Sequence, residues 1–405
     1  MNNKSSYRKM VVLFTLLYLM SYVTRINYSA VISEISEAEQ LKKSLLSLAL
    51  TGSFITYGGG QLLSGFMGDR IQPKIPISCA LLTTICTNLL IPICQSPYQM
   101  TAVWCVNGLA QAFMWPPLVR IMTELFNEHE YSRACELVSM GSSVGTIFVY
   151  VTAPIVIAVS GWRMVFVLCA LLAVCMLIWW IKTCPKVENA PVQKVQADST
   201  AQKIMPGGLI AVVAIVMISI ILTGALREGV NTWMPSYISE TYGLQNEISI
   251  LSGAIMPLFS MMCFHIATQL YRKKFKNPMV CAGVMFLSGL VATTLLSLTA
   301  SKNALLSVLC FALLIGSMHG VTLILTCMVP AHFKQFGNIS FISGLLNSCA
   351  YVGAALSTYG IAVLCENSGW AFTIGVWCMI ALLGVVLCFV VAKQYGKKIM
   401  NNQEK

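Results

Sequence analysis

The chain has 405 residues, of which 57% are hydrophobic and only 10% are charged. This composition excludes an ordinary soluble globular protein. The net charge of +11 suggests nucleic-acid binding at first sight, but the basic residues are concentrated in the short stretches between apolar runs. That distribution is typical of a membrane protein, and no nucleic-acid partner is expected.

Apolar runs long enough to cross a bilayer, about 20 residues each, recur along the chain. We predict twelve spans, at 10–33, 44–67, 75–94, 98–122, 134–159, 164–182, 207–238, 248–270, 278–299, 304–329, 339–365 and 370–392. The first run is longer than the apolar part of a signal peptide and lacks a small-residue cleavage site, so we interpret it as a span. The sequence predicts an all-α polytopic membrane protein with twelve transmembrane helices.

The basic residues indicate the orientation of these spans. With both termini on the cytoplasmic side, twenty of the 26 Lys and Arg lie inside, counting Arg120 and Lys182 at the inner ends of their spans. Four lie outside, and Arg25 and Arg227 lie deep within spans. An excess of Lys and Arg in cytoplasmic loops is the usual pattern. We therefore expect a multi-pass protein of the cell inner (cytoplasmic) membrane with both termini in the cytoplasm.

A polar stretch at 183–206 divides the spans into two sets of six, and we interpret it as a cytoplasmic linker between bundles at 1–182 and 207–405. The two halves show weak self-similarity. Ser160-Gly161-Trp162 recurs as Ser368-Gly369-Trp370 and Val144-Gly145 as Val352-Gly353, each 208 residues later, and Arg25 recurs as Arg227, 202 residues later. Two parallel six-helix repeats are typical of transporters, with a substrate site near the bilayer midplane.

The loop after the second span supports this interpretation. It reads Gly65-Phe-Met-Gly68-Asp69-Arg70-Ile-Gln-Pro73-Lys74 and resembles the loop between spans 2 and 3 of the major facilitator superfamily, although Gln72 stands at a usual glycine. The resemblance implies the major facilitator fold, with two pseudo-symmetric six-helix bundles. Glycines there allow close helix approach, and Asp69 with Arg70 provides a breakable charge contact. We expect Gly65, Asp69 and Arg70 to act in conformational gating.

Arg25 and Arg227 are the residues that most directly suggest a function. An arginine near the centre of a span costs roughly 2.5–3.5 kcal/mol, so it usually has a use. Because the two occupy repeat-related spans, we expect their guanidinium groups to face each other across a central cavity and to bind an anion bidentately. Tyr18 and Tyr22 share a helix face with Arg25 and would line the same site. Pairing of Arg227 with Glu228 is an alternative, but adjacent helix positions point about 100° apart, so we expect that pair to be strained.

Three patterns carry a more specific resemblance. They are Tyr22-x-x-Arg25-x-Asn27, Asn107-Gly108-x-x-Gln111-x-x-x-Trp115-Pro116-Pro117-x-x-Arg120 and Leu226-Arg227-x-Gly229-x-x-x-Trp233-x-Pro235-x-Tyr237. Together they resemble the organophosphate:phosphate antiporter family, which includes the glycerol-3-phosphate and hexose-phosphate carriers. The resemblance implies that Arg25 and Arg227 bind the phosphoryl group and that Tyr18, Tyr22 and Trp115 line the cavity. It also implies exchange of a phosphate ester for inorganic phosphate by alternating access.

Several positions depart from the family pattern. Gln61 stands where the glycerol-3-phosphate carrier has a lysine, Ser142 stands where it has a histidine, and Asn231-Thr232 replaces an acidic residue. These positions are expected to contact the organic part of the substrate, whose identity stays open within phosphate esters of the sugar phosphate or glycerol phosphate type. His319, inside a predicted span, could hydrogen-bond the ligand or pack between helices. We expect His265 to face a bundle interior and His332, beside a loop, to be solvated.

No other chemistry is indicated. The sequence has no nucleophile–base pair, ATP-binding motif or metal-ligand spacing, so an enzyme, a cofactor and a metal are not expected. The expected partners are a small anionic substrate and the lipid bilayer, with the protein as a monomer. Two other functions remain open: a proton- or sodium-coupled symporter of a carboxylate or phosphonate, and a non-transporting membrane sensor of external phosphate esters.

Overall fold

The computed structural model describes residues 4–41, 43–68, 70–185, 207–243, 255–299, 303–333 and 339–397. The chain divides into two compact units: unit 1 is Met1–Lys194 with Gly337–Ser348, and unit 2 is Val195–Phe336 with Cys349–Lys405. Each unit is described by itself below. Residues 186–206 of the predicted linker at 183–206, and the predicted gating residue Asp69, lie outside the described residues.

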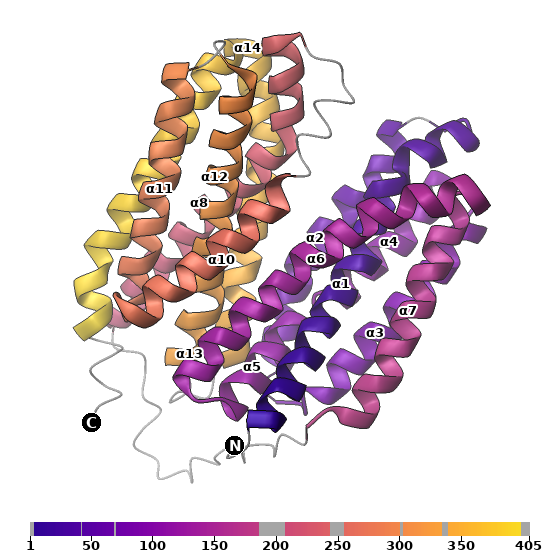
Figure 1. Ribbon diagram of the computed structural model, residues 1–405, viewed down its shortest axis with the longest axis horizontal. Coiled ribbons are helices and arrows are strands. Elements are labelled where there is room, and N and C mark those ends of the chain that lie inside the picture. The colour runs from indigo at the N-terminus through magenta and orange to yellow at the C-terminus, as the bar shows by residue number, and fades with distance from the viewer. Residues whose placement is uncertain are drawn as a thin grey trace. The chain divides into compact units, whose positions relative to one another are not determined.

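Unit 1 is a helical bundle, drawn from indigo to magenta in Figure 1. Its helices are α1 (Lys4–Ala38), α2 (Lys43–Gly68), α3 (Lys74–Leu90) followed by the 3₁₀ helix η1 (Ile91–Ile93), α4 (Pro97–Gln111), α5 (Trp115–Leu125), α6 (Glu128–Ser160) and α7 (Trp162–Thr183). Within the bundle, α2 packs on α4 and α1 packs on α6. These contacts bring the helix that carries Arg25 between α2 and α6.

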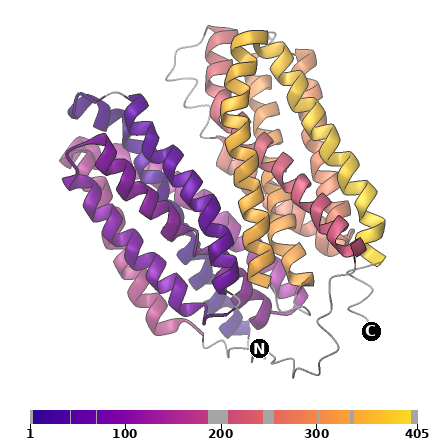
Figure 2. The ribbon, with the colours of Figure 1, turned by 180° about the vertical axis from the view of Figure 1, so that it is seen from behind.

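Unit 2 is a second bundle. Its helices are α8 (Gly207–Tyr242), α10 (Met256–Lys273), α11 (Pro278–Thr299), α12 (Ala304–Leu323), the π-helical segment η3 (Ile324–Met328), α13 (Val329–His332) and α14 (Ile339–Tyr395), the first turns of which belong to unit 1. Figures 1 and 2 show α14 folding back on itself, so that its two halves run side by side in opposite directions. The reversal comes at Gly369, which has non-helical backbone angles.

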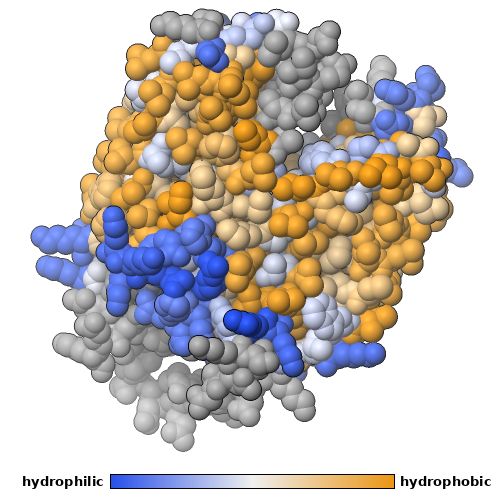
Figure 3. Space-filling model, in the orientation of Figure 1, coloured by the Kyte–Doolittle hydropathy of each residue, from blue (hydrophilic) through white to orange (hydrophobic). Residues whose placement is uncertain are grey.

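The structure confirms the predicted all-α polytopic membrane fold. The described residues contain helices and turns but no strand. Nine helices among them are long and apolar enough to span a bilayer, and helices α2, α4 with α5, and α10 cover the other three predicted spans. Large apolar side chains are exposed along the bundles, among them Phe54, Val159, Leu298 and Met379. Figure 3 shows this apolar surface along the flanks of both units, as expected for helices that face lipid.

The predicted fourth span, 98–122, is not one continuous helix. It is interrupted between Gln111 and Trp115, where α4 ends and α5 begins. Pro116 and Pro117 lack the backbone N–H groups that would continue the helical hydrogen bonds, and a proline ring clashes with the preceding turn. At the first positions of a new helix these donors are not needed, so the prolines fit there. The break places Trp115 at the start of α5.

The predicted internal repeat is visible in the backbone. Gly161 has φ 78° and ψ 171°, and Gly369 has φ 73° and ψ 176°. Only glycine adopts such angles readily, which explains why Ser-Gly-Trp occurs at both reversals. A second match concerns the arginine helices: a Cβ on Gly145 would contact Leu19 O on α1, and one on Gly353 would contact Ile221 O on α8. Leu19 and Ile221 precede Arg25 and Arg227 by the same number of residues, so both arginine helices pack against a glycine at equivalent positions.

Candidate functional site

In unit 1, aromatic rings hold the Arg25 side chain in place. Its guanidinium carbon lies 4.3 Å from the centroid of the Tyr22 ring on α1 and 4.9 Å from that of Tyr57 on α2. A guanidinium over the face of a tyrosine gains about 0.5–2 kcal/mol, the larger values where water is excluded. The side chain is half-buried. Contacts with two rings restrict where the guanidinium can lie, and the N–H groups of an arginine in such a place suit the oxygen atoms of an anion.

Tyr18 and Trp115 continue the group of aromatic rings around Arg25. The Tyr18 ring lies 5.3 Å from that of Tyr22 and 4.7 Å from that of Trp115, centroid to centroid. Tyr18 and Tyr22 share a face of α1, whereas Trp115 comes from α5. The structure therefore brings Tyr18, Tyr22, Arg25 and Trp115 together, with Tyr57 added. We call these five residues the aromatic wall.

Two polar groups near the wall are buried without a protein partner. The amide nitrogen and oxygen of Gln61 have no hydrogen bond within the part of the chain that the structure describes, and its side chain is fully buried. The indole N–H of Trp115 is in the same situation. A buried polar group without a partner costs about 1–3 kcal/mol. Gln61 lies one helical turn after Tyr57 on α2, so it lies on the face that carries Tyr57. Both groups suit a polar ligand.

A polar network on the other side of α1 explains why Arg25 points toward the wall. Asn27 donates to Asn88 Oδ1 at 2.7 Å, and Asn88 and Asn107 donate to Thr24 O at 3.2 Å. Ser21 donates to Gln111 Oε1 at 2.6 Å. All these side chains are buried. Because satisfied buried networks fix one arrangement, the network holds this face of α1 against α3 and α4. Arg25 is left on the face toward α2.

In unit 2, Arg227 on α8 has two polar neighbours. Its Nε lies 2.9 Å from Glu228 Oε1, and its Nη1 donates to Thr322 Oγ1 of α12 at 3.2 Å. The alternative in which Arg227 pairs with Glu228 is therefore seen in the structure, although we expected that pair to be strained. The angle between adjacent Cα–Cβ bonds is large, but both side chains are long enough to turn toward each other. Only 11% of the Arg227 side chain is exposed, compared with 31% for Glu228.

Of the other residues predicted for the site, two lie near Arg227. His319 is one turn before Thr322 on α12, and its ring packs edge-on against Phe264 at 5.6 Å. Asn231 lies one turn after Arg227 on α8 and is exposed. Ser142, in unit 1, is buried, and its hydroxyl donates to Ser139 O of its own helix at 2.6 Å.

The predicted gating residues lie at the end of α2. A Cβ on Gly65 would come within 2.8 Å of Ser340 O, in the first turn of α14 that belongs to unit 1. Arg70 is exposed, with its guanidinium carbon 3.5 Å from the Phe66 ring centroid. The buried Arg120 of α5 donates to Gly68 O at 2.6 Å. Close approach at Gly65 agrees with the expectation for that glycine, and gating itself stays a prediction.

Two histidines differ from the sequence-based expectation. His332 is buried, not solvated, and its Nδ1 lies 2.9 Å from Tyr395 Oη. It sits at the end of α13, where α10 and α14 cover it. His265, expected to face the bundle interior, is exposed on α10. Neither contributes to the surroundings of Arg227 described above.

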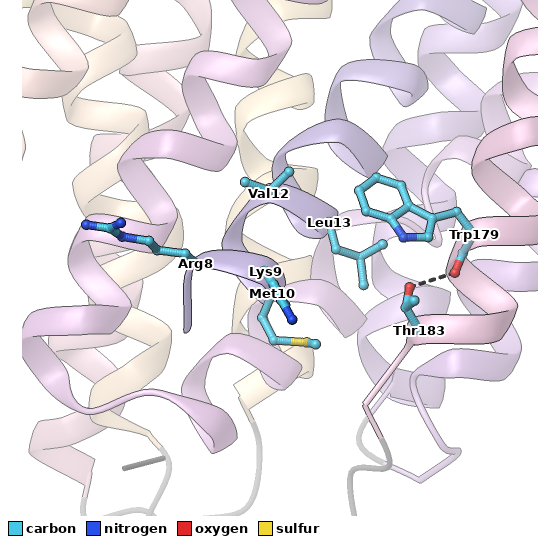
Figure 4. A pocket seen from close by; sticks show the side chains of 7 residues that line it. All are labelled: Arg8, Lys9, Met10, Val12, Leu13, Trp179 and Thr183. Atoms are coloured by element: carbon cyan, nitrogen blue, oxygen red, sulfur yellow. Dashed lines mark hydrogen bonds between the residues drawn. The ribbon is translucent and has the colours of Figure 1, made fainter. Parts of the chain in front are cut away.

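A separate hollow of about 380 Å³ lies between the start of α1 and the end of α7. Figure 4 shows it with Arg8, Lys9, Met10, Val12, Leu13, Trp179 and Thr183 around it. The Arg8 side chain extends away from the hollow in this view. Because apolar side chains supply most of its surface, the hollow is unsuited to a small anion. The arginine sites deeper in the helices are the better candidates.

Sequence reasoning missed Tyr57 and Thr322. Tyr57 precedes Gln61 by one helical turn, and Thr322 follows His319 by one turn. Residues three or four apart on a helix share a face, so both could have been found from the residues already singled out. The sequence alone does not show which neighbouring helix packs against each of these faces.

Comparison with known proteins agrees with the predicted resemblance. A family model described as Major Facilitator Superfamily matches residues 14–358. The membrane sensor protein UhpC of Salmonella typhimurium is 23% identical, with 90% of this chain and 86% of the relative covered. A probable hexose phosphate transport protein of Chlamydia muridarum is 21% identical, covering 87% and 84%. The solved proton:xylose symporter XylE superposes with a TM-score of 0.78 at 13% identity, covering 96% of each chain.

These matches confirm the predicted family and the prediction that the chain is a transporter-type membrane protein, not an enzyme. They extend through both halves of the chain, as the repeat requires. The arrangement around Arg25 and Arg227 offers a cation at a defined place in each unit. What these sites can do chemically is bind the oxygen atoms of an anion.

Proposed function

The chain belongs to the major facilitator superfamily, and we propose that it carries an organic phosphate ester across the membrane in exchange for inorganic phosphate. The observation that carries this proposal is the aromatic wall. It presents a half-buried guanidinium, fixed between Tyr22 and Tyr57, within a membrane-spanning bundle. The name of the Chlamydia muridarum relative, a probable hexose phosphate transport protein, supports the same substrate class.

Arg25 and Arg227 bind the phosphoryl group in this proposal, one from each unit. Arginine keeps its charge when buried, and its planar fork matches phosphate oxygens. Trp115, Tyr18 and Tyr22 line the site, while Gln61, with two buried polar atoms, contacts the organic part of the ester. Asn231 and His319 extend the site in unit 2, and Ser142 borders it in unit 1. That the two guanidinium groups face each other stays a prediction.

In this proposal, the charges of the bound anion and of the two guanidinium groups favour alternating access. A bound anion adds charge-assisted hydrogen bonds to both guanidinium groups, so the loaded protein changes conformation more readily than the empty one. Such a difference favours exchange over net leakage. Gly65, Asp69 and Arg70 gate the change at the end of α2. The excess of Lys and Arg on one side supports cytoplasmic termini in the inner membrane, with the protein acting as a monomer.

The test is phosphate exchange in proteoliposomes loaded with inorganic phosphate and challenged with phosphate esters, phosphonates and carboxylates. Arg25→Lys and Arg227→Lys are each expected to lose at least about 90% of the exchange rate, because lysine keeps the charge but lacks the bidentate fork. Arg163→Lys is the matched control, because Arg163 pairs with Glu39 at an exposed position. Near-normal exchange by either lysine variant would refute the proposal. Uptake that follows a proton gradient without internal phosphate would indicate symport instead.

A membrane sensor of phosphate esters is the second candidate, because the Salmonella typhimurium relative carries that name. A sensor needs the same anion site but no flux. Binding of a phosphate ester to the purified protein, measured together with exchange in proteoliposomes, separates the two. Binding without exchange favours the sensor, whereas binding with exchange favours the transporter.

A further inference from the structure

Arg227, the proposed anion-binding residue of unit 2, already contacts a carboxylate of its own chain. The Nε of Arg227 lies 2.9 Å from Glu228 Oε1, which makes a direct ion pair. A second edge of the guanidinium donates from Nη1 to Thr322 Oγ1 at 3.2 Å. The repeat-related Arg25 of unit 1 lies over the rings of Tyr22 and Tyr57. In unit 2, a carboxylate of the same helix contacts the guanidinium of Arg227.

A carboxylate and a phosphate compete for the same guanidinium groups. Both bind arginine through two parallel N–H···O bonds, one of which comes from Nε when the side edge of the fork is used. With Glu228 on Nε, this edge is occupied. An entering phosphate must either displace the carboxylate or bind elsewhere on the guanidinium with a negative charge close by. Either route lowers the gain from binding.

We propose that Glu228 is an intramolecular counterion of Arg227 that the transported anion has to displace. This inference rests on the proposed function, in which Arg227 binds the anion. Glu228 is suited to the role because it is the immediate chain neighbour of Arg227 and about three times as exposed, 31% against 11%. Its carboxylate can leave by rotation of its own side chain, without movement of the backbone.

The counterion has two consequences. First, the empty protein does not carry an uncompensated cation in the interior of unit 2, which would be unfavourable because a buried charge loses its hydration. Second, the free energy of anion binding at Arg227 is only the difference between the anion's contacts with Arg227 and the Glu228 contacts that it replaces. Binding is weakened, and release is correspondingly easier, because the carboxylate returns as the anion leaves.

The experiment measures the dissociation constant of radiolabelled inorganic phosphate for the purified full-length protein. Glu228→Gln removes the charge with little change of shape and is expected to tighten binding about threefold or more, as for the loss of one partly exposed competing ion pair. Glu228→Ala is expected to do the same. Glu240→Gln is the matched control: this carboxylate is on the same helix but accepts a hydrogen bond from Trp370 Nε1 at 2.7 Å. It is expected to leave phosphate binding unchanged.

A double variant shows whether Glu228 acts through Arg227. In an Arg227→Gln protein, binding is weaker and the further change Glu228→Gln is expected to have no effect. Equal tightening with and without Arg227 overturns the inference, since Glu228 would then repel anions generally. Unchanged binding in both Glu228 variants, with weakened binding in Arg227→Gln, also overturns it but leaves the proposed function intact. Unchanged binding in Arg227→Gln contradicts the proposed function itself. Thermal unfolding of each variant identifies a protein that has lost its fold.

Discussion

The close packing of α6 against α1 at Gly145 allows a quantitative prediction about the Arg25 site. A Cβ added at Gly145 would lie 2.7 Å from Leu19 O and 3.2 Å from Tyr22 Cβ. Backbone oxygen cannot move without its helix, so the two helices would have to separate by about 0.7 Å to reach an ordinary contact of 3.4 Å. Tyr22 is one of the rings that hold Arg25. Gly145→Ala should therefore disturb both stability and anion binding.

The expected cost is about 1–3 kcal/mol from overpacking, reduced by up to about 1 kcal/mol because alanine is the better helix former. Gly59→Ala is the control, since nothing lies within 4 Å of the added Cβ there. It should leave the melting temperature in detergent unchanged or slightly raised. Gly353→Ala should be more severe than Gly145→Ala, because its Cβ would fall closer to Ile221 O on α8.

The assay is thermal unfolding of the three variants in one detergent, with phosphate binding measured on the same preparations. The order of melting temperatures should be Gly59→Ala highest, then Gly145→Ala, then Gly353→Ala. If Gly145→Ala melted like the Gly59 control and bound phosphate normally, the packing of α6 on α1 would not position Arg25. The reasoning from the repeat would then fail for unit 1.

Three further predictions concern other contacts. Asn88→Leu should destabilise the protein by about 2–3 kcal/mol in chemical unfolding, because the hydrogen bond to Thr24 O is lost in a buried network; a loss under about 0.5 kcal/mol would contradict this. Arg120→Met should increase proteolysis after α2, because the hydrogen bond to Gly68 O is lost; an unchanged cleavage pattern would count against that role. Burial raises the pKa of the Cys184 thiol to about 11, with a partly opposing effect of a nearby lysine, so Cys184 should react slowly with maleimide near pH 7 and about tenfold faster per pH unit above it; a rate that levels off below pH 9 would refute the raised pKa.

The helices were predictable because apolar runs separated by polar residues are a strong signal. Each of the twelve predicted spans corresponds to helix in the described residues. The break between α4 and α5 was hidden in an apolar run, although Pro116 and Pro117 were visible in it. A run shows where a segment crosses the membrane, whereas the missing N–H groups of proline decide whether it crosses as one helix.

Parts of the site were predictable only along one helix at a time. Helical spacing placed Tyr18, Tyr22 and Arg25 on one face, and the structure agrees. Tyr57 comes from another helix, so no spacing within α1 could reveal it. The angle between neighbouring Cα–Cβ bonds disfavoured the Arg227–Glu228 pair, but both side chains are long and flexible enough to make the contact that the structure shows. His332 was misjudged because closeness to a loop in sequence does not show which helices cover it.

The two arginine helices share their backbone packing but differ in the side chains around each arginine. Gly145 and Gly353 contact the backbone at equivalent points of α1 and α8, so the arginines enter their units at equivalent positions. Backbone packing of this kind tolerates little change, because any side chain would force the helices apart. The partners of each arginine are set by side chains alone and are free to differ, as the rings at Arg25 and the carboxylate at Arg227 do. Under the proposed function, this equivalent packing with unlike partners would let Arg25 stay between the rings of Tyr22 and Tyr57 while Arg227 exchanges the Glu228 carboxylate for the anion.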